Sequence, residues 1–165
     1  RNHYREMVAA GWRPEDALTY YHDRSRDNAR TPMQWDDTEN AGFTHGKPWL
    51  GVNPNYKNIN VAAQTEDEDS ILNYYKRLIR FRKERDAMVY GSFRLLVPEH
   101  PTVFAYLREL EDERYAVLLN FSDKPSSFSD EALKSFKQVV LSNVGRTAFD
   151  ADALELSPFE AVVVK

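Results

Sequence analysis

The stretch that decides the fold is SRDNARTPMQWDDTENAGFTHGKPWLGVNPNY, residues 25–56. It holds three prolines and three glycines, which break helices and strands, so no long regular element is expected here. Loops longer than about 12–15 residues in compact domains are usually functional or disordered. Four aromatic side chains argue for order: Trp35, Phe43, Trp49 and Tyr56. The sequence therefore predicts a long, ordered, functional loop.

The polar run at the start of this loop carries the candidate chemistry. Arg26 and Arg30 can each present a planar fork to a carboxylate or to the vicinal hydroxyls of a sugar, and Asp27 could orient one of them. Trp35 and Trp49 could stack on sugar faces. The structural alternative places the arginines in buried ion pairs that hold the loop, with the tryptophans plugging it. Spacing alone favours that alternative.

The composition of the whole chain excludes several functional classes. The 165 residues include 22 Lys and Arg against 26 Asp and Glu, for a net charge of −4, which gives no electrostatic reason to bind nucleic acid or an anionic membrane. Without cysteine there is no disulfide, no cysteine-based zinc site and no thiol nucleophile. No apolar run approaches the ~20 residues that span a bilayer. We therefore expect a soluble protein.

Helices are expected on both sides of the loop. A short helix should stop at Gly11, and a second should begin at Pro14 and run to about Tyr21. The clearest helix is predicted from about Glu68 to Asp86, with Thr65 and Glu68 at capping-box spacing. One face of that helix carries an apolar stripe, which should pack against a sheet or other helices: Ile71, Leu72, Tyr75, Leu78 and Ile79.

Beyond residue 91 the pattern changes to strands joined by short polar turns. Antiparallel strands are predicted at residues 93–97, 102–108, 114–121, 137–142 and 159–164. No metal site or cofactor is proposed. The acidic turn at residues 109–113 lacks the ligand spacing of a calcium loop, and the histidines are widely separated: His3, His22, His45 and His100.

The segment at residues 25–56 closely resembles the end of the catalytic barrel in the oligo-1,6-glucosidase group of alpha-amylase-family glycoside hydrolases. The resemblance continues through INVAAQ, DSILNYYKRLIRFRK, VYGSF and the final LSPFEAVVVK. It implies an α+β fragment. Residues 1–88 would be the last helices and long loop of a (β/α)8 barrel, and residues 89–165 a small, antiparallel, sandwich-like C-terminal β-domain. Since such barrels need ~250 residues, most of the active site would lie upstream.

The family resemblance also implies site residues. The aspartate nucleophile, the glutamate acid/base and the assisting aspartate of these retaining enzymes would all lie upstream, so no catalytic residue is assigned here, and the fragment alone should be inactive. The first arginine of the SRDNAR motif, Arg26, would bind the terminal sugar of the substrate. Asp27, Asn28 and Arg30 match the same motif and would support Arg26.

The function implied is that of an exo-acting alpha-glucosidase cleaving α-1,6 and also α-1,4 bonds of short oligosaccharides. Trehalose-6-phosphate hydrolases and sucrose isomerases share similar tails and stay open as alternatives. A third alternative is a non-catalytic carbohydrate-binding or stabilising module. Its support is a set of aromatic residues on the predicted strands: Phe104, Tyr106, Tyr115 and Phe121. The alternation of inward and outward side chains along a strand instead favours a packing role for them. The expected partners are an oligosaccharide substrate and the upstream barrel, and neither nucleic acid nor a membrane is expected as a partner. The expected location of the protein is the cytoplasm.

Overall fold

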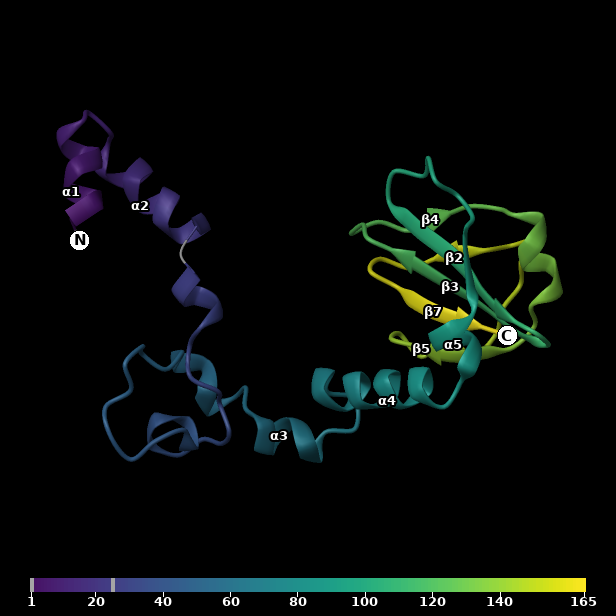
Figure 1. Cartoon of the computed structure of the whole chain (residues 1–165), viewed down its shortest axis with the longest axis horizontal. Helices are drawn as coiled ribbons and strands as arrows, with labels where there is room; N and C mark the ends of the chain where they lie inside the picture. Colours follow the sequence, from purple (N-terminus) through teal and green to yellow (C-terminus); the bar gives the residue numbers. More distant parts are fainter. Residues whose placement is uncertain (1, 25) are drawn as a thin grey trace. The chain divides into compact units, whose positions relative to one another are not determined.

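A computed structural model describes residues 2–24 and 26–165, except for the side chains of Asn2 and Asn28. The chain forms two compact units, Arg1–Ser70 and Ile71–Lys165 (Figure 1). This division concerns compactness, so the domain junction expected after residue 88 stays a prediction. Each unit is described by itself.

The first unit opens with two short helices close to their expected places. α1 (Asn2–Ala9) is followed by Gly11, whose φ of +94° provides the left-handed turn that ends the helix. α2 (Pro14–Arg24) starts at the predicted proline and continues one turn past Tyr21. Arg13 precedes this helix and pairs with the Asp16 carboxylate at 2.7 Å.

The long segment that follows is ordered but has little regular structure, as the prolines and glycines predict. Three single 3-10 turns occur in it: η1 (Arg26–Ala29), η2 (Glu39–Gly42) and η3 (Pro54–Lys57). The Asn53 side chain accepts a hydrogen bond from the Asn55 amide at 3.1 Å and so caps η3. The segment is thus built from single turns, with no longer helix or strand among its described residues.

The prediction of one helix from Glu68 to Asp86 is wrong at both ends. The structure has α3 (Val61–Glu66), α4 (Ile71–Lys83) and α5 (Asp86–Tyr90). α3 is capped by Asn60, whose side chain accepts from the Ala63 amide at 2.8 Å, so Thr65 lies inside a helix instead of capping one.

The break between α3 and α4 is made by a local turn. The Asp67 carboxylate accepts from the Asp69 amide at 3.0 Å, and the Ser70 hydroxyl donates to the Gln64 carbonyl at 2.6 Å. Side-chain bonds of this kind compete with helical ones, which explains why the acidic run ends α3 rather than starting α4.

The second unit is built on a five-stranded antiparallel sheet in the order β1-β2-β3-β7-β5, with a two-stranded β4-β6 sheet beside it (Figure 1). The five predicted strands are all present. The two-residue strands and the turn η4 (Glu131–Ser135) were not predicted, because they are too short to show a repeating pattern of apolar residues. The strand bounds are Ser92–Leu95 (β1), Val103–Leu110 (β2), Glu113–Asn120 (β3), Ser126–Ser127 (β4), Val139–Ser142 (β5), Glu155–Leu156 (β6) and Ala161–Val164 (β7).

Two apolar clusters cover the two faces of the large sheet. One face packs against the β4-β6 side and contains Leu107, Leu118 and Leu156, all fully buried, which makes the unit sandwich-like. On the other face, Phe81 of α4 and Met88 of α5 pack with Tyr115, Val117 and Val163. α4 therefore meets the sheet through Phe81, whereas three residues of its predicted apolar stripe are exposed: Ile71, Tyr75 and Ile79.

Candidate functional site

Residues 26–29 of the SRDNAR motif form η1, and Arg30 follows it, whereas Ser25 lies outside the described residues. Arg26 and Asp27 lie in the same 3-10 turn, and the Arg30 amide donates to the Asp27 carbonyl at 3.0 Å. All three residues are exposed, so the burial that the structural alternative requires is not seen for either arginine. The Asn28 side chain lies outside the described residues. The assignment of Arg26 to a sugar, with its supporting residues, stays a prediction.

The chain after η1 is fixed by hydrogen bonds on both of its sides. On one side, the Val61 and Ala62 amides of α3 donate to the carbonyls of Gln34 and Trp35, each at 2.9 Å. On the other side, the Trp35 amide donates to the Ala41 carbonyl at 2.9 Å. The first amides of a helix have no partner within the helix, so this pairing also satisfies the start of α3.

A left-handed turn follows, and it is the most strained part of the first unit. Asn40, Ala41 and Gly42 have φ of 54°, 57° and 65°, a region that residues with a Cβ rarely adopt. The Asp36 carboxylate accepts from the Thr38 amide at 2.9 Å and from its hydroxyl, and these bonds hold the pKa of Asp36 below its usual value. A Cβ at position 42 would lie 2.6 Å from that carboxylate, so this place requires glycine.

The turn also anchors the next loop, residues 44–51. The Asn40 side-chain amide donates to the carbonyls of Thr44 and Gly46, both at 3.2 Å. The other end is held by Lys57, whose ammonium group donates to the Asp37 carbonyl at 2.7 Å. Sequence reasoning missed this anchoring, although the Asn-Ala-Gly triplet at positions 40–42 is a signal for left-handed backbone.

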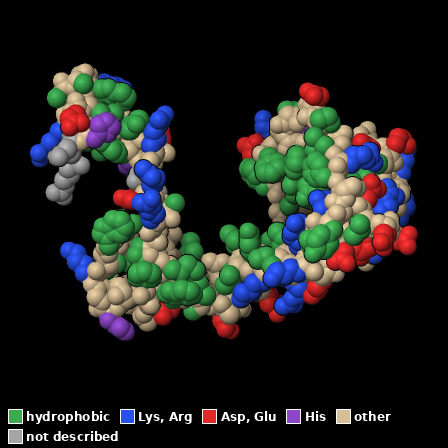
Figure 2. Space-filling view, in the orientation of Figure 1, with side chains coloured by type: hydrophobic (Ala, Val, Ile, Leu, Met, Phe, Trp, Pro, Cys, Tyr) green, Lys and Arg blue, Asp and Glu red, His purple; other side chains and the backbone are tan. Residues whose placement is uncertain are grey.

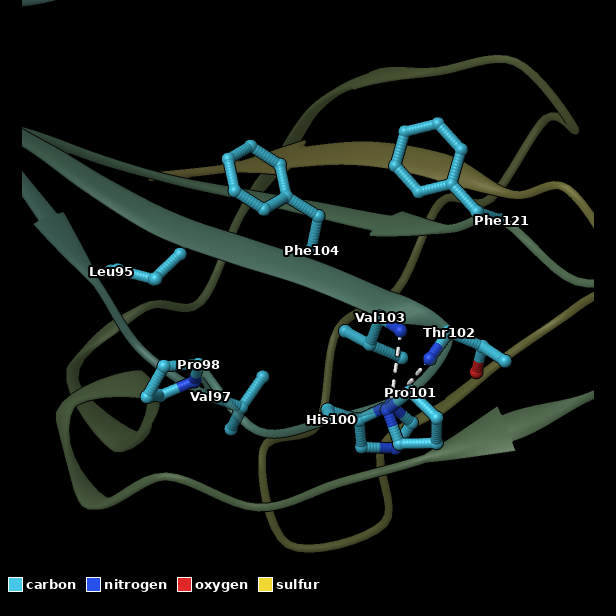
Figure 3. Close-up of a pocket in the computed structure, with 9 residues that line it drawn as sticks. All are labelled: Leu95, Val97, Pro98, His100, Pro101, Thr102, Val103, Phe104 and Phe121. Atoms are coloured by element: carbon cyan, nitrogen blue, oxygen red, sulfur yellow. Dashed lines mark hydrogen bonds between the residues drawn. The ribbon is translucent and has the colours of Figure 1, made fainter.

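A second feature is a shallow hollow of about 230 Å³ at the end of β1 and β2 in the second unit. Figure 3 shows the rings of Phe104 and Phe121 on the same side of β2, while Leu95 lies on the neighbouring strand β1. The His100 Nδ1 accepts from the amides of Thr102 at 3.3 Å and Val103 at 2.9 Å, which fixes the turn that enters β2. Phe121 is 69% exposed, contrary to the packing role expected for it, whereas Tyr115 is buried as expected. Phe104 is 40% exposed, and its ring packs against that of the half-buried Tyr106 at a centroid distance of 5.4 Å.

Within residues 2–24 and 26–165, no group of three or more His, Cys, Asp or Glu side chains is placed to hold a metal ion. Among the same described residues, no helix is long and apolar enough to cross a membrane.

Comparison with known protein families places both parts of the chain. Residues 3–91 match the alpha amylase, catalytic domain, family, and residues 93–163 match the maltogenic amylase, C-terminal domain, family. The chain belongs to the alpha-amylase family. Its fold is accordingly the end of the family's catalytic barrel followed by the C-terminal β-domain.

Individual relatives within this family include an oligo-1,6-glucosidase and enzymes with two other names. The oligo-1,6-glucosidase of Parageobacillus thermoglucosidasius is 44% identical over 99% of this chain, which spans only about 30% of that relative. Two crystal structures are also similar. That of isomaltulose synthase from Klebsiella sp. LX3 has 42% identity and a TM-score of 0.86, covering 98% of this chain and 30% of that one. That of trehalose-6-phosphate hydrolase from Bacillus licheniformis has 35% identity and a TM-score of 0.90, covering 99% of this chain and 30% of that one.

Proposed function

We propose that this chain is part of a retaining, exo-acting alpha-glucosidase that hydrolyses α-1,6, and also α-1,4, glucosidic bonds of short oligosaccharides. The observation that carries the proposal is the similarity to an oligo-1,6-glucosidase, which runs through both domains of the chain at 44% identity. The exposed arginines of the SRDNAR segment are compatible with it. The catalytic carboxylates belong to the upstream part of the barrel, and the enzyme acts in the cytoplasm.

In this proposal Arg26 binds the terminal sugar of the substrate and takes no part in proton transfer. A guanidinium group presents two parallel donors to vicinal hydroxyls, which closes the pocket around the chain end and favours exo-cleavage. Asp27, Asn28 and Arg30 hold the turn that carries Arg26. The partners are therefore an oligosaccharide and the upstream barrel.

Kinetics of the full-length enzyme test this role. Arg26→Ala should lower kcat/KM for isomaltose by about 100-fold, the order expected when a substrate loses its alignment with the reacting groups. Arg26→Lys should also be impaired, because the ammonium group keeps the charge but lacks the fork. Arg5→Ala, an exposed arginine of α1, is the matched control and should leave kcat/KM unchanged. An unchanged specificity constant for Arg26→Ala would refute the assignment.

The choice among related reactions needs a substrate comparison. The similarity to trehalose-6-phosphate hydrolase and to isomaltulose synthase keeps those two activities as alternatives. The full-length enzyme should be given isomaltose, maltose, trehalose 6-phosphate and sucrose in parallel, with products followed by proton NMR. Release of α-glucose from isomaltose supports the proposal, whereas isomerised sucrose or glucose 6-phosphate as the main product supports an alternative.

The hollow at Phe104 and Phe121 favours a second candidate function, non-catalytic carbohydrate binding. Two exposed aromatic rings on the same side of a strand can stack on the apolar faces of sugars. Calorimetric titration of this chain with isomaltose and longer glucans tests it. Binding that Phe121→Ala abolishes supports a module, and the absence of heat supports a purely structural β-domain.

A further inference from the structure

Trp49 differs from every other large apolar side chain described in the first unit. Its side chain is 87% exposed, whereas the other exposed ones there are only 47–51% exposed: Trp12, Leu18, Met33, Trp35, Phe43 and Ile59. A half-exposed ring rests one face on the protein, but a ring as exposed as Trp49 offers nearly all of its surface. Figure 2 shows hydrophobic side chains on the visible surface of this part of the chain.

The loop that carries Trp49 is nevertheless firmly held at its base. Asn40 joins the carbonyls of Thr44 and Gly46, and the Gly46 amide donates to the Thr44 hydroxyl at 3.1 Å. The return of the chain is held by the bond from Lys57 to Asp37. Trp49 is therefore a solvent-exposed ring on a loop with a fixed base.

The fixed base has a conformational cost. Asn40 and Ala41 both adopt left-handed backbone, a conformation that is unfavourable for residues with a Cβ, and more so for Ala41 than for Asn40. Such strained residues concentrate at binding and catalytic sites, where the strain holds a group in place. The fixed base therefore holds the exposed ring of Trp49 in one place, as a group that contacts a ligand requires.

The chemistry of that ligand follows from the ring and from the position of the loop. An indole face suits a flat, partly apolar partner with polar edges, and a pyranose ring has such a face in its axial C–H groups. In barrel enzymes the loops that follow the strands form the catalytic face, and residues 44–51 follow Arg26 in the same long segment, with only the 3-10 turn η2 between η1 and this loop.

We propose that Trp49 is a specificity-determining residue that stacks on the sugar of the leaving group, the ring on the far side of the scissile bond from the terminal glucose. The proposal rests on the proposed function, since it needs a glucoside substrate, and it goes beyond it by naming what holds the second sugar. Arg26 recognises the end of the chain, and Trp49 selects leaving groups that are themselves sugars.

The test compares two substrates of the full-length enzyme that differ only in the leaving group. Isomaltose releases a sugar, while α-glucosyl fluoride releases fluoride, which cannot stack. Trp49→Ala should lower kcat/KM for isomaltose about tenfold, the change that 1.4 kcal/mol of lost binding produces. It should leave kcat/KM for α-glucosyl fluoride unchanged. Trp49→Phe should lie between the wild type and Trp49→Ala on isomaltose.

Two further variants separate stacking from folding. Trp12→Ala removes the same side chain from the turn before α2 and should leave the ratio of the two specificity constants unchanged. Asn40→Ala loosens the base of the loop. As a single substitution it should lower the ratio of kcat/KM for isomaltose to kcat/KM for α-glucosyl fluoride, but it should change this ratio little when Trp49→Ala is already present.

Equal losses on both substrates, or no loss on isomaltose, would overturn the role of Trp49 while leaving the proposed function intact. A wild-type enzyme that hydrolyses neither substrate would overturn the proposed function, and this inference with it.

Discussion

Glu160 is the residue whose burial and charge matter most to the second unit. Its side chain is fully buried, and both carboxylate oxygens accept from the Arg146 guanidinium, one at 2.9 Å. The Ser157 amide donates to the same carboxylate at 2.7 Å. Glu160→Gln keeps the size but removes the charge that Arg146 faces, so we expect the free energy of unfolding to fall by about 3 kcal/mol. Amide hydrogen exchange of β7 and β5 measures it.

The control for this prediction is an exposed ion pair in the same unit. Glu131 pairs with Lys134 at 2.8 Å, but water surrounds both groups. Glu131→Gln should therefore leave the exchange of β7 and β5 almost unchanged. Equal effects of the two substitutions would show that the Glu160 pair is screened as strongly as a surface pair.

The same pair predicts how stability depends on pH. The hydrogen bond from Arg146 lowers the pKa of Glu160 below its unfolded value, despite the opposing effect of burial. The folded state thus binds this proton less tightly than the unfolded state. The contribution of Glu160 should be fully present above the unfolded pKa, about 4.3, and be lost as pH falls towards the folded pKa. Urea unfolding from pH 7 to pH 3 should show this loss in the wild type and a smaller one in Glu160→Gln.

At the scale of elements, the junction between α5 and β1 depends on one glycine. A Cβ at Gly91 would lie 2.3 Å from the Ala87 carbonyl oxygen and 2.9 Å from that of Glu109, both backbone atoms that cannot move alone. Gly91→Ala should therefore separate α5 from the sheet and destabilise the second unit by about 1–3 kcal/mol. The matched control is Gly51→Ala, where a Cβ would meet nothing within 4 Å. Urea unfolding of both variants, followed by circular dichroism, measures the difference.

Elements with a clear period could be predicted from the sequence, and elements made by single side-chain bonds could not. The alternation of Val103, Ala105 and Leu107 on the buried face of β2 is visible in the sequence, and the strand is where it was expected. The break between α3 and α4 depends on where the Asp67 and Ser70 side chains bond, which charge patterning does not show. In the candidate site, the SRDNAR motif was visible in the sequence, but the anchoring of the next loop by Asn40 was not, because the sequence does not show which carbonyls the Asn40 side chain contacts.

At the scale of the whole molecule, we expect the 165-residue chain alone to be unable to hydrolyse glucosides. A retaining glycosidase needs one carboxyl group with a raised pKa beside an ionised one about 5 Å away. Hydrogen bonds lower the pKa of the Asp16, Asp36 and Glu160 carboxyl groups, which is opposite to the raised pKa that a general acid needs. Release of glucose from isomaltose by the purified chain would contradict this expectation.

The isolated chain should also self-associate, because α4 leaves an apolar stripe exposed. Ile71, Tyr75 and Ile79 recur every four residues along one side of the helix, while Phe81 is buried against the sheet. A contiguous apolar surface of this kind is typical of an interface. Sedimentation velocity should show a weight-average mass that rises with concentration through the micromolar range.

Substitution of the stripe tests its part in that association. The double variant Ile71→Gln, Tyr75→Gln should shift the association to higher concentration, because it replaces apolar contact area with groups that prefer water. Lys76→Gln, one position further along α4, alters an exposed side chain outside the stripe and should not. A wild-type chain that stays monomeric at every concentration would mean that this stripe is too small to drive association, and its exposure would then have no consequence for the isolated chain.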